Sequence, residues 1–295
     1  MRVALLVAAL LALAAGTARA YPQLQFTTGA TRCGECHVSP DGGGLLTDYG
    51  RDEAGETLSG RGDGRLLHGA WTPPDWLTLG GGLRGALGGK RLAGEAAELL
   101  AFPMQADLYA RVAVGPVSLN VTVGGNGAAR PGDGAMAITS YLVSREHFVA
   151  FHQEDAPWSV RAGRFFPTFG LRTHDHTAYV RRHLDMYLLE EPYALEGEYT
   201  RGRWQAFASA FLGNPIADLA AGDRASGAAA SLERLLDDGA VAGHARAAFG
   251  PEDHRYLVGA VGKRWFAGPG LLLQAELDVQ RQRLDTGFVR YQLVG

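Results

Sequence analysis

Apolar and polar residues alternate along two neighbouring stretches of this chain, residues 102–114 and 117–123. Every second position of the first stretch is apolar, and the positions between include Asp107 and Arg111. Gly115-Pro116 separates the two stretches and is a turn signal. A period of two is the mark of strands that have one apolar and one polar face. The chain is therefore predicted to fold into β-sheet.

The same alternation returns along most of the chain, with glycine-rich turn signals between the stretches. It is found in residues 76–87, 158–163, 195–200, 204–212, 256–266 and 271–279, and the turns are predicted at residues 201–202, 237–239, 268–270 and 286–287. Roughly twelve strands are predicted, many of them about 9 to 14 residues long. Strands average about 5 to 6 residues in soluble sandwiches, whereas those that cross an outer membrane need about 9 to 11.

Two folds compete for residues 71–295: a soluble β-sandwich or lipocalin-like domain, and a membrane barrel that is apolar outside and polar within. Strand length and the charged residues on the polar faces favour the barrel. The expected fold is all-β, an antiparallel transmembrane β-barrel of about 12 strands. Outer-membrane barrels commonly finish on an aromatic residue, whereas this chain stops at Leu293-Val294-Gly295. A truncated sequence and an unusual closure both explain that ending.

The first twenty residues, Met1 to Ala20, are predicted to be a secretory signal peptide. Arg2 supplies the positive start, and Ala18-Arg19-Ala20 the small-x-small cleavage site. The rival interpretation, a membrane anchor, needs about 20 apolar residues, and the apolar run here is about 13. Beyond residue 20 no stretch approaches about 18 consecutive apolar residues. The net charge of -3 gives no case for binding nucleic acid.

Both cysteines of the chain lie in Cys33-Gly34-Glu35-Cys36-His37. Cys-x-x-Cys-His is the attachment motif of a c-type haem, in which two thiols add to the vinyl groups and the histidine binds the iron. We predict Cys33 and Cys36 as thioether attachment points and His37 as an axial ligand of one covalent haem c. One alternative is a disulfide, in which the adjoining His37 would have no required role. The other is a thioredoxin-like redox pair, which would require a βαβ setting that is missing here.

The motif lies in a short segment, residues 21–70, that is too small to wrap a haem by itself. A covalent haem can staple a small domain, but this segment is expected to lean on the strands that follow. The predicted domains are a signal peptide (1–20), a monohaem cytochrome c segment (21–70) and an outer-membrane β-barrel (71–295).

The stretch from Thr28 to Arg51 resembles the head of bacterial fused monohaem-cytochrome/porin proteins. It does so through its Cys-x-x-Cys-His, Pro-x-Gly-Gly-Gly and Tyr-Gly-Arg elements. Residues 161–172 also resemble a strand-and-loop segment of porin-like barrels. Members of this family join one c-type haem to an outer-membrane barrel, and iron-oxidising bacteria use one to pass electrons inward. The resemblance implies electron transfer, not a particular donor.

The sixth ligand of the iron decides its potential and reactivity. His68 is the histidine nearest to the motif on the C-terminal side and is the first candidate. Further histidines in the first half of the predicted barrel could reach a haem held in the lumen: His147, His152, His174, His176 and His183. Met104 has the parity that would face lipid.

Other polar clusters are weaker candidates. His174-Asp175-His176 could bind a metal, because alternate residues of a strand point the same way, but an exposed polar loop is the simpler interpretation. The pairs Glu190-Glu191 and Asp237-Asp238 are predicted to be solvated loop charge.

The expected function is electron transfer by an outer-membrane c-type cytochrome, with no catalysis by side chains. Its partners would be outer-membrane lipid, a periplasmic electron carrier and an external electron donor or acceptor. The haem segment would face the periplasm or lie inside the lumen. Two alternatives stay open. A peroxidase-like haem enzyme would need an open iron position and a distal acid-base group, and a passive porin would use the haem only as a plug.

Overall fold

The computed structural model describes residues 24–27, 29–30, 32–57, 69–90, 98–126, 142–153, 155–172, 191–213, 225–251 and 253–294. The predicted signal peptide lies outside these residues. Three short helices, α2 (Leu24–Thr27), α3 (Cys33–Cys36) and α4 (Asp48–Thr57), come before any strand. We call the described residues from 24 to 57 the N-terminal segment. Among the described residues, no helix combines the length and hydropathy that crossing a bilayer requires.

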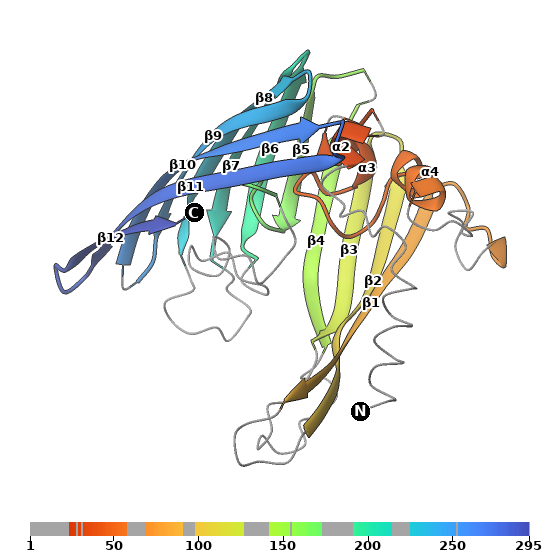
Figure 1. The fold of residues 1–295 in the computed structure, drawn as a ribbon, viewed down its shortest axis with the longest axis horizontal. Helices are drawn as coiled ribbons and strands as arrows, with labels where there is room; N and C mark the ends of the chain where they lie inside the picture. The colour runs from red at the N-terminus through yellow and green to blue at the C-terminus, as the bar shows by residue number, and fades with distance from the viewer. Residues whose placement is uncertain are drawn as a thin grey trace.

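Twelve strands follow and form one antiparallel sheet in simple sequence order (Figure 1). They are β1 (Leu77–Lys90), β2 (Glu98–Val114), β3 (Val117–Asn126), β4 (Leu142–His152), β5 (Trp158–Arg164), β6 (Tyr193–Arg201), β7 (Trp204–Leu212), β8 (Ser226–Leu236), β9 (Gly239–Phe249), β10 (Asp253–Phe266), β11 (Leu271–Leu284) and β12 (Val289–Val294). The predicted strands and their number are confirmed. Each pairs with its neighbours in sequence, and among the described residues no pairing joins β1 to β12.

The connections at one end of the sheet are all tight, and we call this the tight-turn end. They are residues 115–116, 153–157, 202–203, 237–238 and 267–270. Gly115, Gly202 and Gly270 have φ of 56°, 56° and 64°, which a glycine adopts without strain. At the opposite end, residues 91–97, 127–141, 165–192 and 213–225 make longer connections, while 250–252 and 285–288 are short.

The two faces of the sheet have opposite chemistry. On β11, Leu277 is 55% exposed while the next residue, Asp278, is 0% exposed. The same reversal holds along the sheet: exposed apolar residues include Leu83, Leu108, Leu119, Val149, Leu195 and Val258, and buried polar ones include Asp107, Asn120, Arg161, Glu196, Gln205, Glu233 and His244. A soluble sandwich would bury the apolar face. The apolar-outside, polar-inside alternation is confirmed.

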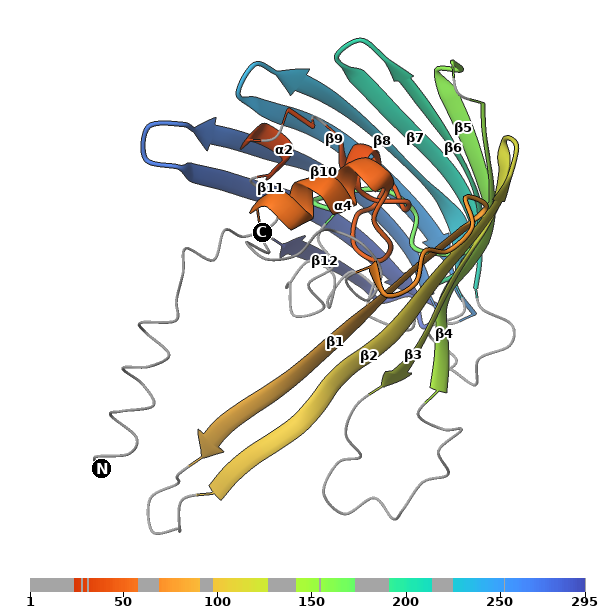
Figure 2. The ribbon, with the colours of Figure 1, turned by 90° about the vertical axis from the view of Figure 1, so that its right-hand side faces the viewer.

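The sheet curves, and the N-terminal segment lies on its concave side (Figure 2). This concave side is the polar face, because Arg161, Arg172 and Lys263 of the sheet domain all contact residues of the N-terminal segment. We call it the inner face. The N-terminal segment therefore contacts the sheet domain directly, as expected from the sequence for residues 21–70.

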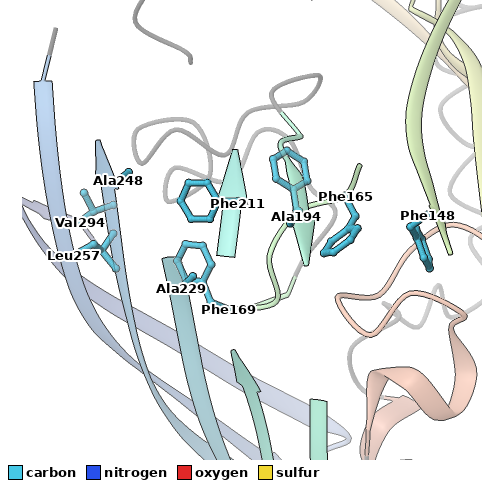
Figure 3. Close-up of a cluster of buried hydrophobic side chains, with 10 residues drawn as sticks. Phe148, Phe165, Phe169, Ala194, Phe211, Ala229, Ala248, Leu257 and Val294 are labelled. Carbon is cyan, nitrogen blue, oxygen red and sulfur yellow. The ribbon is translucent and has the colours of Figure 1, made fainter. Parts of the chain in front are cut away.

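Part of the inner face is apolar and is covered by a loop that folds inward from the end of β5. This interior loop, residues 165–172, contributes three phenylalanines to a buried cluster (Figure 3). The cluster consists of Phe148, Phe165, Phe166, Phe169, Ala194, Phe211, Ala229, Ala248, Leu257 and Val294. Phe165 and Phe148 pack edge to face with ring centroids 5.6 Å apart. The apolar contact fixes the interior loop against strands from β4 to β12.

Two details differ from the sequence-based expectation. The β1–β2 register pairs Arg84 with Gln105 but Gly85 with Pro103, so Met104 is an extra residue in a bulge and the alternation predicted through it is broken. Glu191, predicted to be solvated loop charge, is 2% exposed and lies 3.0 Å from the guanidinium of Arg164. Its charge is buried because that guanidinium neutralises it. Glu190 lies outside the described residues.

Candidate functional site

The two cysteines of the Cys-x-x-Cys-His motif occupy the ends of α3, a single helical turn. Residues three apart in a helix lie on the same side, so both thiols face one region. Neither cysteine is in a disulfide. The amide of His37 closes the turn by donating to the carbonyl of Cys33 at 2.8 Å. This geometry is compatible with two thioether bonds to one porphyrin.

His37 is oriented by the glycine run that follows it. Its ring nitrogen Nδ1 lies 2.9 Å from the carbonyl oxygen of Gly43. Gly42, Gly43 and Gly44 have φ of 82°, 68° and 60°, a left-handed path that bends the chain back toward the ring. A carbonyl acceptor requires the proton on Nδ1, which assigns the lone pair to Nε2. Metal-binding histidines are commonly oriented in this way.

Thr47 joins α3 to α4. Its hydroxyl donates to the carbonyl of Glu35 at 2.6 Å and accepts the amide of Gly50 at 3.1 Å, which caps the start of α4. A Cβ at position 50 would collide with the backbone of Cys36, so only glycine permits this close approach. The capping threonine and the glycine together hold α4 against the cysteines.

Burial and neighbouring carboxylates act on the thiol of Cys36. Burial, then the charges of Glu35 and Glu53, raise the pKa of Cys36 above its ordinary value. With Cys36 free, its neutral thiol is therefore favoured over the thiolate. A neutral thiol resists metal capture and disulfide exchange, both of which need the thiolate.

A buried arginine of β5 holds the loop after the motif. The Nη1 atom of Arg161 donates to the hydroxyl of Ser39 at 2.9 Å and lies 3.4 Å from Oδ1 of Asp41. Asp41 is 1% exposed and Arg161 is 5% exposed, so this ion pair is screened from water. Residues 120 positions apart are joined here, and we call this contact the Arg161 clamp.

The same guanidinium is anchored in the wall and in the interior loop. Its Nη2 lies 2.8 Å from Oε1 of Glu196 and donates to the hydroxyl of Thr168 at 2.8 Å. Thr168 in turn donates its amide to Glu196 at 2.6 Å. The Phe165 ring lies under the guanidinium, 3.9 Å from ring centroid to Cζ. One arginine therefore connects the N-terminal segment, β5, β6 and the interior loop.

Arg172, at the end of the interior loop, makes a second connection. It donates to the carbonyl of Pro40 at 3.5 Å, to Gln205 at 3.1 Å and to Glu233 at 2.6 Å. Burial disfavours its charge, but interactions with Cys33 and Glu233 raise the pKa of Arg172 above its usual value. Arg172 therefore stays charged beside the motif.

These contacts place the N-terminal segment at the tight-turn end of the inner face. Arg32 donates to the carbonyl of Gly202 in the β6–β7 turn. Lys263, near the β10–β11 turn, donates to Gln25 at 3.3 Å. Gln205 and Glu233, the partners of Arg172, also lie close to tight turns.

No family model matches the chain, and a comparison with curated proteins finds no significant match. Solved structures that share some of the fold are outer-membrane proteins. OprB of Pseudomonas putida is 13% identical with a TM-score of 0.44 over 74% of this chain and 68% of that one. OmpT of Vibrio cholerae, in vitro folded, is 12% identical with a TM-score of 0.38 over 74% and 82%. A loop-deletion mutant of the same OmpT is 13% identical with a TM-score of 0.36, over 74% of this chain and 86% of that one. At these scores the resemblance is distant.

The candidates for the second iron ligand divide into two groups. His68, His174, His176 and His183 lie outside the described residues, so their ligand roles stay predictions, as does the metal site suggested for His174-Asp175-His176. His147 is described, and both ring nitrogens have protein partners: Ser144 at 2.8 Å and Tyr193 at 3.0 Å. Those hydrogen bonds give His147 a structural role. His152 is exposed at the end of β4.

The clamp residues were not predicted from the sequence. Ser39 and Asp41 lie in a turn-forming run, and Arg161 reads as an ordinary polar position of a strand. The signals that pointed to them are the two resemblances, of residues 28–51 to a cytochrome head and of residues 161–172 to a porin-like strand and loop. These resemblances mark the two segments but do not say that the segments contact each other. Asp237 and Asp238 do match their prediction, since they form surface pairs with Arg203 and Arg264.

Proposed function

We propose that this chain is an outer-membrane electron-transfer protein that carries one covalent haem c on the inner face of a barrel-type sheet. The observation that carries the proposal is the ring of His37, oriented by Gly43, beside two cysteines that are not disulfide-bonded. When bound, haem c would supply the one-electron couple of its iron. The remaining tasks, attachment, orientation and shielding, belong to the protein.

Each residue of the motif has a distinct task in this proposal. The S–H bonds of Cys33 and Cys36 would add across the two vinyl C=C bonds, each forming one C–S and one C–H bond with no leaving group. Nε2 of His37 would bind the iron. The Gly43 carbonyl would hold the Nδ1 proton and so keep the imidazole oriented. The Arg161 clamp would hold the whole segment on the sheet through buried ion pairs.

A membrane location is supported by the faces and lengths of the strands. The outer face presents exposed leucines and valines, and the inner face is charged and polar, as expected for a barrel in lipid. In a bilayer every backbone group has to be paired. We therefore propose that the outer edges of β1 and β12 are also paired in the membrane. A closed barrel would resist unfolding by a denaturing detergent at room temperature and would migrate as a compact band in electrophoresis without heating. An open sheet would unfold and would not give this band.

The position of the N-terminal segment supports an orientation. It lies at the tight-turn end, and short turns face the periplasm in outer-membrane barrels. We propose that the haem faces the periplasm, within reach of a soluble electron carrier. An epitope inserted at residues 268–270, in the β10–β11 turn, should be hidden from antibody on intact cells and detected after permeabilisation. Detection on intact cells would reverse the orientation.

Reconstituted vesicles test the function against its alternatives. The full chain would be placed in vesicles that enclose a membrane-impermeant coloured electron acceptor, with an impermeant reductant outside. Reduction of the acceptor should require Cys33 and Cys36, and an inert solute of the reductant's size should not enter. A matched control is His254→Ala, because His254 packs edge to face against Phe249 at the start of β10, the end of the strand opposite the tight turns. His37→Ala should abolish the reduction.

Other outcomes identify the alternatives. Ion conductance that is equal for the native chain and Cys33→Ser/Cys36→Ser, without reduction of the acceptor, would indicate a passive porin. Turnover of hydrogen peroxide by the haem protein would indicate a peroxidase-like enzyme.

A further inference from the structure

Three potential metal ligands that are not part of the Cys-x-x-Cys-His motif meet on the inner face. His244 is on β9, and Glu276 and Asp278 are on β11. Nε2 of His244 lies 2.6 Å from Oδ1 of Asp278 and 3.6 Å from Oε1 of Glu276. The side chains of His244 and Asp278 are 0% exposed, and that of Glu276 is 4% exposed. One imidazole and two carboxylates thus converge in a site removed from water.

A glycine makes room for this convergence. Gly259 on β10 pairs with His244 on one side and with Asp278 on the other, so the three residues lie in line across the sheet. A Cβ at position 259 would collide with both Oδ1 of Asp278 and Nε2 of His244. The absence of a side chain at the central position lets the two outer side chains meet above it. The strands are therefore shaped around the cluster.

The charge of Asp278 distinguishes it from other buried acids. Elsewhere on the inner face and the loops that it covers, buried carboxylates face guanidinium groups: Asp107 with Arg145, Glu191 with Arg164, Glu196 with Arg161, Glu233 with Arg172 and Asp253 with Arg255. Within the described part of the chain, Asp278 has no arginine or lysine partner. Its Oδ2 atom also has no hydrogen-bond partner there. A buried carboxylate in this state is costly unless a cation compensates it.

We propose that His244, Glu276 and Asp278 bind a divalent transition-metal cation. One imidazole nitrogen with carboxylate oxygens suits Zn²⁺ and its first-row neighbours, whereas Mg²⁺ and Ca²⁺ prefer oxygen alone. The interior loop supplies the supporting contacts. The amide of Leu171 donates to Oε2 of Glu276 at 3.0 Å, and the Phe169 ring lies 5.4 Å from that of His244. These contacts would orient the ligands and exclude water.

The test uses the full chain in detergent, refolded with a chelator and then dialysed against Zn²⁺. Zinc is measured by elemental analysis and protein by amino-acid analysis, so the result does not depend on haem. The native chain should bind one Zn²⁺ tightly, and Asp278→Asn should weaken binding at least about tenfold, since even outer-shell changes cost about 10- to 100-fold. Asp253→Asn is the matched control, because it makes the same change at another buried inner-face acid, and it should keep the zinc.

A second measurement avoids any dependence on how the variants fold. Zn²⁺ should raise the urea midpoint of the native chain in proportion to the logarithm of its concentration, because it binds the folded form. A native chain that takes up no tight zinc and shows no such rise would overturn the proposal. Equal zinc affinity in Asp278→Asn and the native chain would overturn it as well.

Discussion

The guanidinium of Arg161 on β5 lies 3.4 Å from the carboxylate of Asp41, four residues after His37. Both side chains are buried, and Oε1 of Glu196 lies 2.8 Å from the other terminal nitrogen of the same guanidinium. The Cys-x-x-Cys-His motif is thereby fastened to the inner face of the sheet by a contact between residues 120 positions apart in the chain. Such a contact fixes the position of the motif relative to the sheet, as the proposed function requires.

Removing the clamp should destabilise the protein strongly. Arg161→Met would leave the carboxylates of Asp41 and Glu196 buried without their cation, a loss of roughly 3–5 kcal/mol in the free energy of unfolding. Urea unfolding measures it. Trypsin should also cut the N-terminal segment at Arg51 faster in the variant than in the native chain.

Arg203→Met is the matched control for the clamp. Arg203 pairs with Asp237 at 2.5 Å, but the two side chains are 60% and 84% exposed. Exposed pairs contribute about 0–1 kcal/mol, so the urea midpoint should barely move. Equal losses for Arg161→Met and Arg203→Met would show that the clamp does not hold the segment.

A charged residue on the outer face should be costly only if that face meets lipid. Leu277 lies near the middle of β11 and is 55% exposed. Leu277→Arg should cost about 2–4 kcal/mol in lipid vesicles, because charge at the bilayer midplane is unfavourable. Phe288→Arg, in the β11–β12 connection, should cost less because the penalty falls toward the interface. A soluble protein would tolerate Leu277→Arg within about 0.5 kcal/mol.

The interior loop depends on Gly170. Its φ is 65°, and a Cβ there would collide with the carboxylate of Glu276. Gly170→Ala should therefore destabilise the protein by about 1–3 kcal/mol through left-handed strain and the steric clash. Gly202 has a similar φ of 56°, and a Cβ there would meet no neighbouring atom. Gly202→Ala therefore measures the cost of the left-handed backbone conformation without a steric clash. In thermal unfolding, Gly170→Ala should lose more stability than Gly202→Ala. Equal losses of stability would contradict a contribution from the close approach of Gly170 to Glu276.

The faces of the sheet could be predicted from the sequence because burial and polarity both follow a period of two. Asp107, Asn120 and Asp278 were expected on the polar face and lie buried on it. The bulge at Met104 could not be predicted, because the local pattern continues through it. The motif residues Cys33, Cys36 and His37 were found by their spacing. Arg161, Arg172 and the His244 cluster were missed, because they are joined to their partners only by the folded sheet.

The thiol of Cys36 should titrate abnormally before haem is attached. Burial and the charges of Glu35 and Glu53 raise the pKa of Cys36, so the thiolate forms only at higher pH. In Cys33→Ser made without haem, alkylation by iodoacetamide should rise at a higher pH than in the same chain unfolded in urea. Glu35→Gln should shift the alkylation profile of the folded chain part of the way toward lower pH. The raised pKa also means that the stability contributed by Cys36 is full below the unfolded pKa and is lost as the pH rises through the folded pKa. Coincident folded and unfolded profiles would contradict this environment.

The most direct test of the central claim is the absorbance spectrum of the purified chain after complete denaturation, recorded reduced and oxidised. The full chain, including the predicted signal peptide (residues 1–20), would be produced in cells that mature c-type cytochromes. A covalent haem should remain with the polypeptide at one per chain, show the reduced and oxidised bands of a c-type haem, and disappear in Cys33→Ala/Cys36→Ala. If the unsubstituted chain shows no haem absorbance after denaturation, covalent attachment of haem at Cys33 and Cys36 is contradicted.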